Sequence, residues 1–290
     1  MNYDEISFEA ADGIAIITLN RPAVLNVISA RPGGTRDQIV DALATAEADA
    51  AIGCVVVRGA GRSFCAGGDL TGNAKRERPI DDVRFLESAA AFYERFAASR
   101  LPTIAEVHGH CLGAGLLLAS ACDLVVAGKG AQFGFPEGRL GLVGATTMVP
   151  VIGRQWAKFL MFTGELISAA QARTLGIVLT IEPDAELHER VLDLAQRVAR
   201  MPREGVELNR RAIDATADAA GDAAARRAAL AHDAATLSMA AHATAPDGRT
   251  FRSILDTEGM DGMKRARAQQ YDAPWLRRPP RRSPAPPTDS

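Results

Sequence analysis

The 290-residue sequence has little of the material that several protein classes require. Its four cysteines, Cys54, Cys65, Cys111 and Cys122, form no CxxC pair, which argues against a zinc centre and a disulfide framework. Aromatic residues make up 5% of the chain and the formal net charge is -2, so no global basic field suits a nucleic acid. No apolar run reaches membrane-spanning length, and no charged-then-apolar leader opens the chain. We therefore expect a cytoplasmic protein with reduced thiols, without a metal, a membrane anchor or a nucleic-acid partner.

What the sequence does contain is an alternation of short β-branched runs and helical patterns, which predicts an α/β fold. Strands are expected at 13–19 and 54–57, with an amphipathic helix between them, which favours a parallel crossover unit. Beyond about residue 184 the pattern is helical and rich in alanine. We predict a mixed core over residues 1–200, a helical region over 201–270, and a disordered, proline- and arginine-rich tail over 271–290.

The stretch 107–123 organises the chain: a strand ends at Val107, a glycine-rich turn follows, and a short apolar helix closes before Asp123. Small residues occupy the expected start of that helix, at Gly113, Ala114 and Gly115. The first N–H groups of a helix have no partner within it, so they can hold an anion or a developing oxyanion. The alternative is a buried helix that packs closely through its glycines.

A second loop of the same character, 63–70, follows the strand at 54–57 and contains adjacent glycines. Backbone N–H groups of Gly68 and Ala114 that converge on one oxygen would form an oxyanion hole. Glu137 follows Phe135 and Pro136 in apolar surroundings. Burial would raise the pKa of its carboxyl group and suit it to proton transfer, although a surface carboxylate or a helix cap would show the same pattern.

Several segments agree in order and spacing with one known family: 17–22, 25–26, 64–70, 109–123, 133–141, 163–176 and, more weakly, 258–267. Together they resemble the crotonase family of enoyl-CoA hydratases and isomerases over roughly residues 5–268. The resemblance implies a crotonase-like spiral of ββα units. It also implies that the helices of 201–270 build a homotrimer or a hexamer formed by two trimers.

The resemblance also implies an acyl-CoA substrate, a role in fatty acid and lipid metabolism, and no separate cofactor. Gly68 and Ala114 would hold the thioester oxygen, and Glu137 would be the catalytic carboxylate. The segment 68–71 would follow the CoA arm, and 23–25 would lie near its nucleotide. The polar segment 73–82 and the helix from Val83 would shape the acyl pocket. The substrate-binding residues implied in this way are Ala23, Leu25, Ala66, Asp69, Leu70, Thr71 and Leu117.

Leu117 departs from the pattern of the hydratases in this family, which place a glutamate at that position. Leucine neither accepts a proton nor orients a water, so only Glu137 remains as an acid. One carboxylate suffices to move a proton between two carbons, which favours isomerisation of a 3-enoyl-CoA to a 2-enoyl-CoA. Two alternatives stay open: a hydratase with an atypical second acid, and a weakly catalytic CoA-binding or scaffold protein. His108 and His110 flank the glycine turn, where a catalytic role is the less favoured interpretation.

Overall fold

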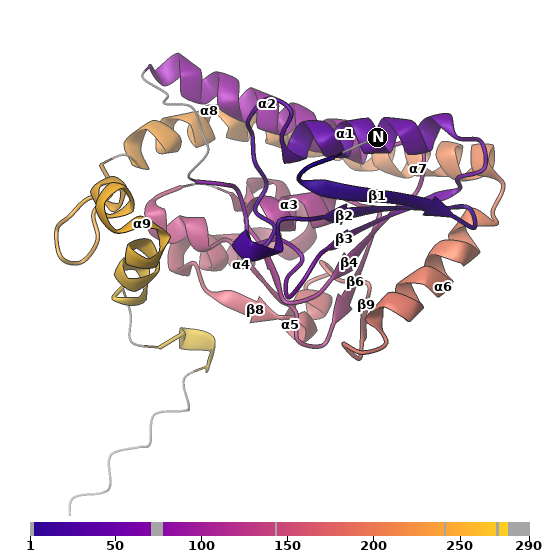
Figure 1. Cartoon of the computed structure of the whole chain (residues 1–290). Helices are drawn as coiled ribbons and strands as arrows, with labels where there is room; N and C mark the ends of the chain where they lie inside the picture. The colour runs from indigo at the N-terminus through magenta and orange to yellow at the C-terminus, as the bar shows by residue number, and fades with distance from the viewer. Residues whose placement is uncertain (1–2, 71–77, 143, 241, 271–272, 278–290) are drawn as a thin grey trace, which may run out of the picture. The chain divides into compact units, whose positions relative to one another are not determined.

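The computed structural model describes residues 3–70, 78–142, 144–240, 242–270 and 273–277 (Figure 1). The chain divides into two compact units, Met1–Ala240 and Ala241–Ser290. The first unit contains both multi-stranded sheets and extends beyond residue 200 to include two further helices. The predicted division by role, a core to residue 200 and a trimerisation region after it, stays a prediction.

The larger sheet has six strands in the order β1-β2-β3-β4-β6-β9, and only β1 and β2 pair antiparallel. Valine and isoleucine dominate β3 and β4, as expected for strands covered on both faces. The parallel register pairs Val56 with Ile104 and Ile104 with Leu124. The strand bounds are Ile6–Ala11 (β1), Ile14–Leu19 (β2), Cys54–Gly59 (β3), Thr103–Val107 (β4), Leu124–Gly128 (β6) and Thr180–Glu182 (β9).

Helices cover both faces of this sheet. On one face, α6 (Leu187–Ala199) packs Leu187 and Val191 against Val56 and Ile104. On the other face, α1 (Thr35–Ala48) packs against β1 and β2. Successive strand residues point to opposite faces, and helices cover both faces. Almost every apolar side chain of the central strands is therefore buried. The prediction of an α/β fold is therefore confirmed.

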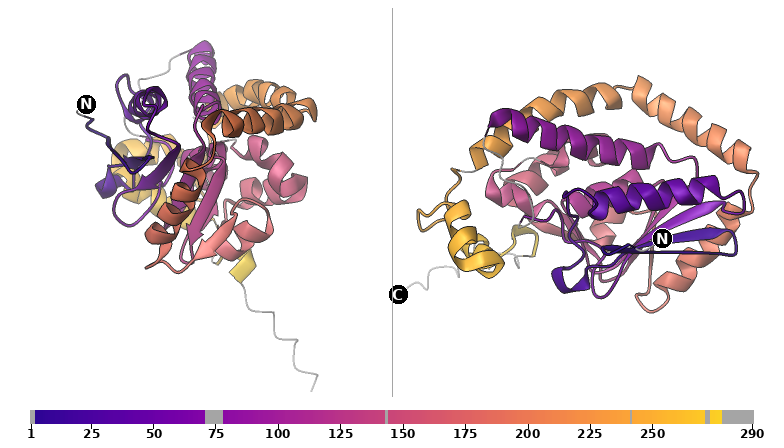
Figure 2. Two further views of the ribbon diagram at one scale, coloured as in Figure 1. Left: turned by 90° about the vertical axis from the view of Figure 1, so that its right-hand side faces the viewer. Right: turned by 45° about the horizontal axis from the view of Figure 1, so that its top comes forward.

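A layer of helices continues from α1 across the sheet. Both views of Figure 2 show α2 (Pro79–Ala97) between α1 and α8 (Asp222–Ala240). Below α2 lies the short apolar helix α3 (Ala114–Ala121), with which it is in contact. The remaining helix of this layer, α7 (Arg203–Ala219), precedes α8. This arrangement places the N-terminus of α3, the predicted oxyanion site, directly beneath α2.

The smaller sheet holds the segment that carries Glu137. It consists of β5 (His110–Leu112), β7 (Gln132–Gly134) and β8 (Leu166–Ser168), in that order. Glu137 follows β7 in the 3-10 helix η2 (Pro136–Leu140). The other elements of the first unit are η1 (Pro22–Val24), η3 (Ala145–Met148), α4 (Val149–Thr163) and α5 (Ala169–Thr174).

The second unit contains α9 (Phe251–Ala268), whose N-cap Thr250 accepts a hydrogen bond from the N–H of Ser253, and η4 (Trp275–Arg277). Most of the predicted disordered tail, residues 271–290, lies outside the described residues.

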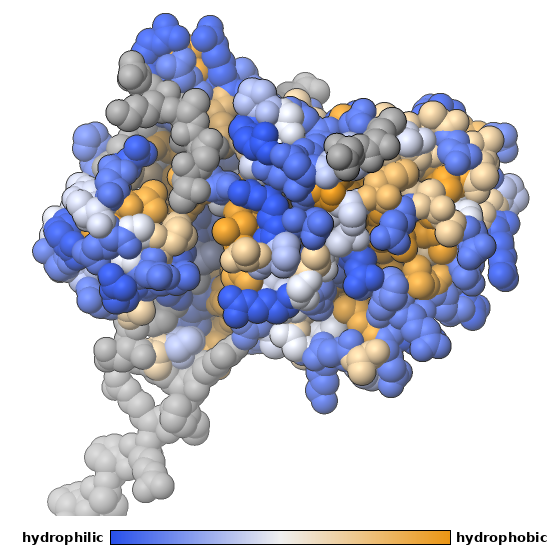
Figure 3. All heavy atoms as spheres, viewed as in Figure 1, coloured by the Kyte–Doolittle hydropathy of each residue, from blue (hydrophilic) through white to orange (hydrophobic). Residues whose placement is uncertain are grey.

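On the face shown in Figure 3, hydrophobic residues form separate patches among hydrophilic ones. No helix of the described chain is long and apolar enough to cross a membrane.

Candidate active site

The loop that follows β3 is fixed against β5 by backbone hydrogen bonds. The N–H of Cys65 donates to the carbonyl of His110 at 2.9 Å, and the N–H of Leu112 donates to the carbonyl of Cys65 at 2.9 Å. This pairing brings the two predicted oxyanion residues together, because a methyl group added at Gly68 would lie 3.9 Å from Ala114 Cβ. Two segments that are distant in sequence therefore meet.

The backbone N–H groups of Gly68 and Ala114 are both available. Helix α3 begins at Ala114, and its first hydrogen bond runs from the N–H of Leu117 to the carbonyl of Gly113 at 2.9 Å. Within the described chain, neither Gly68 nor Ala114 donates its N–H to an acceptor. Two unused donors at one helix N-terminus suit an oxygen that gains negative charge during a reaction.

Glu137 lies beside this helix start. A methyl group added at Gly113 would lie 2.8 Å from Oε1 and 2.9 Å from Oε2 of Glu137, and one added at Gly144 would lie 2.9 Å from Oε1. Gly113 also has a φ of 50°, which favours glycine. Both glycines thus leave room for the Glu137 carboxylate, which is half-buried next to Ala114. The structure brings Gly68, Ala114 and Glu137 into one site.

Leu117 occupies the next turn of α3. It lies four residues after the N-cap Gly113, and its N–H donates to the Gly113 carbonyl at 2.9 Å. The Glu137 carboxylate lies against Gly113, and the Leu117 side chain is half-buried. Helix α3 carries no acidic residue along its length, so no carboxylate of α3 opposes Glu137.

Two side chains near this site were missed by the sequence analysis. The hydroxyl of Tyr93 on α2 donates to the carbonyl of Ala114 at 3.1 Å. Burial raises the pKa of this phenol, with Cys65 and Glu137 adding to the shift, so Tyr93 is neutral at physiological pH. Arg36, in the first turn of α1, is close enough to interact electrostatically with Tyr93. A polar group on the apolar face of the helix at 79–97 was the available signal for Tyr93.

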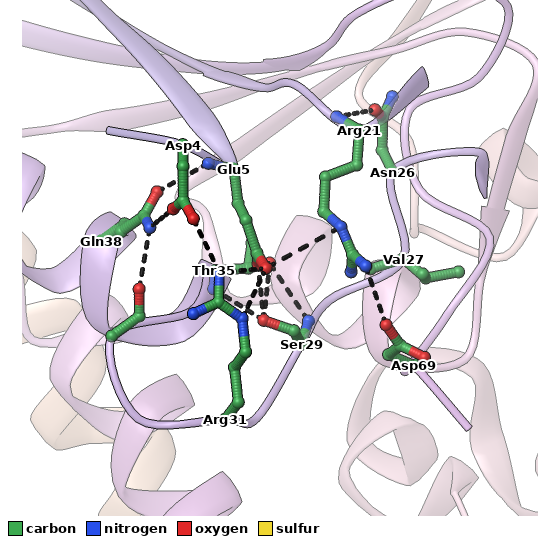
Figure 4. Close-up of polar contacts among 11 residues, drawn as sticks. Asp4, Glu5, Arg21, Asn26, Val27, Ser29, Arg31, Thr35, Gln38 and Asp69 are labelled. Atoms are coloured by element: carbon green, nitrogen blue, oxygen red, sulfur yellow. Dashed lines mark hydrogen bonds and ion pairs between the residues drawn. The ribbon is translucent and has the colours of Figure 1, made fainter. Parts of the chain in front are cut away.

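A polar network supports the loop that carries Gly68 (Figure 4). Arg21 donates through Nη1 to the carbonyl of Val27 and through Nη2 to Oδ2 of Asp69, both at 2.9 Å. The buried Asn26 donates to the carbonyls of Ala60 and Ser63 at 2.8 and 2.7 Å. These bonds fix both ends of the loop, so the Gly68 peptide is held without using its own N–H.

Glu5 lies at the centre of the adjoining cluster (Figure 4). Its buried carboxylate accepts hydrogen bonds from Ser29 Oγ at 2.5 Å, from the Thr35 hydroxyl, and from Arg31 Nε at 3.0 Å. Burial alone would raise the pKa of Glu5, but these donors and the nearby Arg21 guanidinium lower it overall. Glu5 is therefore ionised and structural.

The residues expected along the CoA arm surround the same loop. The N–H of Ala66 donates to the carbonyl of Leu25 at 2.9 Å, which joins two of them, while Ala23 is exposed on η1 and Leu70 is exposed beyond Asp69. The Asp69 side chain points to Arg21, so a ligand would meet its backbone. Thr71 lies outside the described residues. The assignment of these residues to CoA stays a prediction.

The histidines and cysteines near the site have structural partners. His110 Nδ1 lies 3.2 Å from Ser63 Oγ, and His108 Nε2 lies 2.9 Å from the carbonyl of Gly61. Burial raises the pKa of the Cys65 thiol to about 12, which leaves it a poor nucleophile at neutral pH. Its side chain packs against Gly115, where an added methyl group would approach Cys65 Cβ to 2.6 Å. All four cysteines are buried and unpaired.

A separate cavity of about 440 Å³ lies near the ends of β3 and β4. His108 lines it, together with Glu106, Arg58 and His188. Glu106 is paired with His188 Nδ1 at 2.8 Å and with Arg58 Nη2 at 3.5 Å. Among the residues that the structure describes, no group of His, Cys, Asp and Glu side chains could hold a metal ion.

Comparison with known proteins gives a consistent result. Residues 9–244 match the family model of enoyl-CoA hydratase/isomerase. The chain is 30% identical over 222 residues to a probable enoyl-CoA hydratase of Mycobacterium bovis, covering 74% of this chain and 82% of that protein. It is 35% identical over 193 residues to the 2,3-dehydroadipyl-CoA hydratase of Escherichia coli, covering 64% of this chain and 72% of that protein.

Solved structures agree. A crystal structure of an enoyl-CoA hydratase/isomerase from Xanthobacter autotrophicus Py2 superposes with a TM-score of 0.85 at 30% identity, covering 94% of this chain and all of that one. A crystal structure of an enoyl-CoA hydratase from Mycobacterium smegmatis gives a TM-score of 0.80 at 27% identity, covering 93% and 94%. The predicted crotonase-like fold is confirmed by these superpositions.

Proposed function

The chain belongs to the enoyl-CoA hydratase/isomerase family, and from that premise we propose that it isomerises 3-enoyl-CoA thioesters to 2-enoyl-CoA thioesters. The observation that carries this proposal is that the carboxylate of Glu137 lies against Gly113 at the start of α3, while α3 itself carries Leu117 and no acidic residue. Proton transfer between two carbons needs one base that returns the proton it removes. Addition of water needs a group that orients the water as well.

The proposed reaction uses the groups assembled around Gly113. The N–H groups of Gly68 and Ala114 hold the thioester oxygen, and the Glu137 carboxylate removes a proton from C2 of the substrate. The electron pair of that C–H bond forms a dienolate whose oxygen carries the negative charge. The protonated Glu137 then delivers the same proton to C4, so the double bond moves from C3–C4 to C2–C3. The enzyme ends in its starting state, and CoA enters only as part of the substrate.

Hydration is the rival reaction, because the relatives named above are hydratases. It would require a second group to orient water near Glu137, and α3 offers Leu117 in place of a carboxylate. A CoA-binding or scaffold role without turnover is a further alternative. It would leave the free N–H groups of Gly68 and Ala114 and the adjacent carboxylate without a chemical use.

The surface of α7 is compatible with the expected trimer or hexamer. No residue of α7 is buried within this chain, and Leu208 and Ile213 are 64% and 70% exposed. Apolar side chains on an otherwise polar helix are typical of a face that another subunit covers. We therefore include a trimer or hexamer in the proposal, and the mass of the protein in solution tests it.

The test is an assay of the purified full-length protein with 3-enoyl-CoA and 2-enoyl-CoA substrates of several chain lengths. We expect isomerisation without comparable hydration. The Glu137→Gln variant should lower kcat by about 10²- to 10⁴-fold, the range for loss of a general base. Glu189→Gln, at an exposed position of α6, is the matched control and should retain full activity. Brisk hydration without isomerisation, or full activity of Glu137→Gln, would overturn the proposal.

A further inference from the structure

Arg36 is a positively charged side chain with an unused donor beside the candidate active site. It is half-buried, and its Nε is inaccessible and has no hydrogen-bond partner. Its guanidinium lies over the ring of Phe85 on α2, with 5.3 Å between Cζ and the ring centroid. An aromatic face attracts a cation. Unlike a carboxylate, it does not accept a conventional hydrogen bond from an N–H group. The guanidinium therefore keeps open positions for hydrogen bonds.

Among the residues that the structure describes, Arg36 has no carboxylate in direct contact, although the charge of Asp37 acts on it from a longer distance. Within the described chain, no carboxylate oxygen lies within 4.0 Å of it. The neighbouring Asp37 accepts a hydrogen bond from the N–H of Gly33 at 2.7 Å instead. Tyr93, which interacts with Arg36, is neutral because burial raises its pKa. Other half-buried arginines are paired, for example Arg21 with Asp69 at 2.9 Å.

The position of Arg36 is defined by its contacts with α2, the helix that lies over the candidate site. Phe85 and Tyr93 are two turns apart on α2, and Arg36 interacts with both. The Tyr93 hydroxyl in turn contacts the carbonyl of Ala114, the second oxyanion residue. Tyr93 thus links Arg36 to Ala114. The loop expected to follow the CoA arm is held by Arg21 and not by Arg36.

We propose that Arg36 is a specificity-determining residue that binds a carboxylate at the far end of the acyl chain, so that the substrates are ω-carboxyacyl-CoA thioesters. This inference rests on the proposed function, since it names the substrate class of the same site. A guanidinium presents two parallel N–H donors that match a carboxylate, and such pairs are among the strongest polar contacts in proteins. A methyl-ended chain would leave Arg36 unpaired, so it would be disfavoured.

The inference also predicts an unusual response of the free protein. A cation that is partly removed from water without a partner destabilises the fold that holds it. Replacement of Arg36 by methionine keeps a long side chain against Phe85 and removes the charge. The ligand-free Arg36→Met protein should therefore unfold at a higher temperature than the wild type. A purely structural arginine would give the opposite result.

The first experiment measures binding, so that it does not depend on turnover. Saturated acyl-CoA thioesters are titrated in pairs of equal carbon number, such as adipoyl-CoA against hexanoyl-CoA, with the neighbouring chain lengths. The wild type should bind the carboxylate-ended member of at least one pair about tenfold to a hundredfold more tightly, the range for a charged hydrogen-bonded pair. Arg36→Met should abolish that preference, and Arg36→Lys should retain part of it.

The controls test whether Arg36 instead binds the CoA moiety or only supports the fold. Arg197→Met, at an exposed site on α6, should leave binding and thermal stability unchanged. Free CoA is titrated as well: if Arg36→Met weakened free CoA and all thioesters equally, Arg36 would bind a CoA phosphate and the proposal would be wrong. No preference in any wild-type pair, or a lower unfolding temperature of Arg36→Met, would also overturn it. A preference seen in binding without any turnover would instead contradict the proposed isomerase.

Discussion

Two charged side chains, Glu5 and Arg36, lie at the first turn of α1. They differ in how many of their polar atoms have hydrogen-bond partners. Glu5 accepts hydrogen bonds from Ser29, Thr35 and Arg31, so its buried charge is fully used. Arg36, one residue beyond Thr35, faces an aromatic ring and leaves Nε without a partner. The protein can evidently saturate a buried charge at this place. An unsaturated charge beside a saturated one is best explained by a ligand.

The same contrast divides the whole site into a support side and a reaction side. On the support side, Arg21, Asn26 and Asp69 use their polar atoms on the chain itself. On the reaction side, Gly68 and Ala114 donate their N–H groups to no acceptor among the described residues. Changes on the support side should therefore affect stability first. Changes on the reaction side should affect catalysis or binding first.

The largest effect on stability is expected for Glu5→Gln. The variant keeps the shape of the side chain but leaves Arg21 and Arg31 without a buried anion, which should lower the free energy of unfolding by about 3 kcal/mol at neutral pH. Because the folded state lowers the pKa of Glu5, the wild type gains this stability above the unfolded pKa. The gain is lost as pH falls through the lower folded pKa, so the two proteins should converge in acid.

Denaturant unfolding at several pH values measures this difference. Glu9→Gln, on an exposed position of β1, is the control and should change stability by less than about 0.5 kcal/mol. A difference between Glu5→Gln and the wild type that grew on acidification would contradict the assigned role of Glu5.

A slightly smaller effect, and one on catalysis, is expected for Gly113→Ala. The added methyl group would meet both oxygens of Glu137 at under 3 Å, so the carboxylate must move. A displacement of this size should lower kcat by about a hundredfold. Gly33→Ala is the matched control, because Gly33 also has a positive φ, 71°, but has no atom within 4 Å of the added group. It should cost about 1 kcal/mol of stability and no activity.

The comparison of Gly113→Ala with Gly33→Ala tests whether the position of the Glu137 carboxylate matters for catalysis. Steady-state kinetics and thermal unfolding of both glycine variants separate the strain of a left-handed backbone from the displacement of Glu137. Equal activities of the two variants would show that the Glu137 carboxylate does not need its present position.

Much of this site is predictable because it depends on backbone groups in a fixed order. The glycine turn before Ala114 and the Gly-Gly pair at Gly68 place N–H donors through local geometry, and the parallel sheet brings the ends of β3 and β4 together. Glu137 follows β7, which pairs with β5 in the same smaller sheet. The residues themselves suggested that Gly68 and Ala114 converge, whereas the placement of Glu137 with them was implied by the resemblance to the crotonase family.

The parts that were missed depend on contacts between distant side chains. Tyr93 and Arg36 lie on different helices, and neither their partners nor the lack of them can be seen in a helical repeat. Strand β1 was missed for another reason: Asp12-Gly13 is a two-residue hairpin signal with positive φ at both residues, 52° and 81°, but the run before it alternates weakly. The Asp12-Gly13 turn was therefore a stronger indication of β1 than the residue pattern of the strand itself.

An intermediate effect is expected for Asp69→Asn, on the support side. Asparagine removes the charge that Arg21 faces at 2.9 Å, although its amide oxygen still accepts a hydrogen bond. We expect a loss of about 1–2 kcal/mol in the free energy of unfolding and a smaller loss in kcat/KM. Asp81→Asn is the control, because its ion pair with Arg78 is exposed and should contribute little. A large fall in kcat without loss of stability would place Asp69 on the reaction side.

The smallest effect is expected for Tyr93→Phe, which lies at the border between the two sides. The variant loses one hydrogen bond, from the phenol to the carbonyl of Ala114, and keeps the ring that packs beside Phe92. Since the hydroxyl holds the peptide that begins α3, its loss should loosen the oxyanion donor and lower kcat by about threefold to tenfold, equivalent to about 1 kcal/mol.

Tyr3→Phe makes a matched control. The Tyr3 hydroxyl donates to Asp41 at 2.8 Å, away from the site, so its removal should leave kcat unchanged. Because burial keeps the Tyr93 phenol protonated, the ratio of wild-type to Tyr93→Phe activity should stay constant across neutral pH. A ratio that changed with pH would mean that Tyr93 exchanges a proton during the reaction. Tyr93 would then be the second acid that α3 lacks, and hydration would become the favoured reaction.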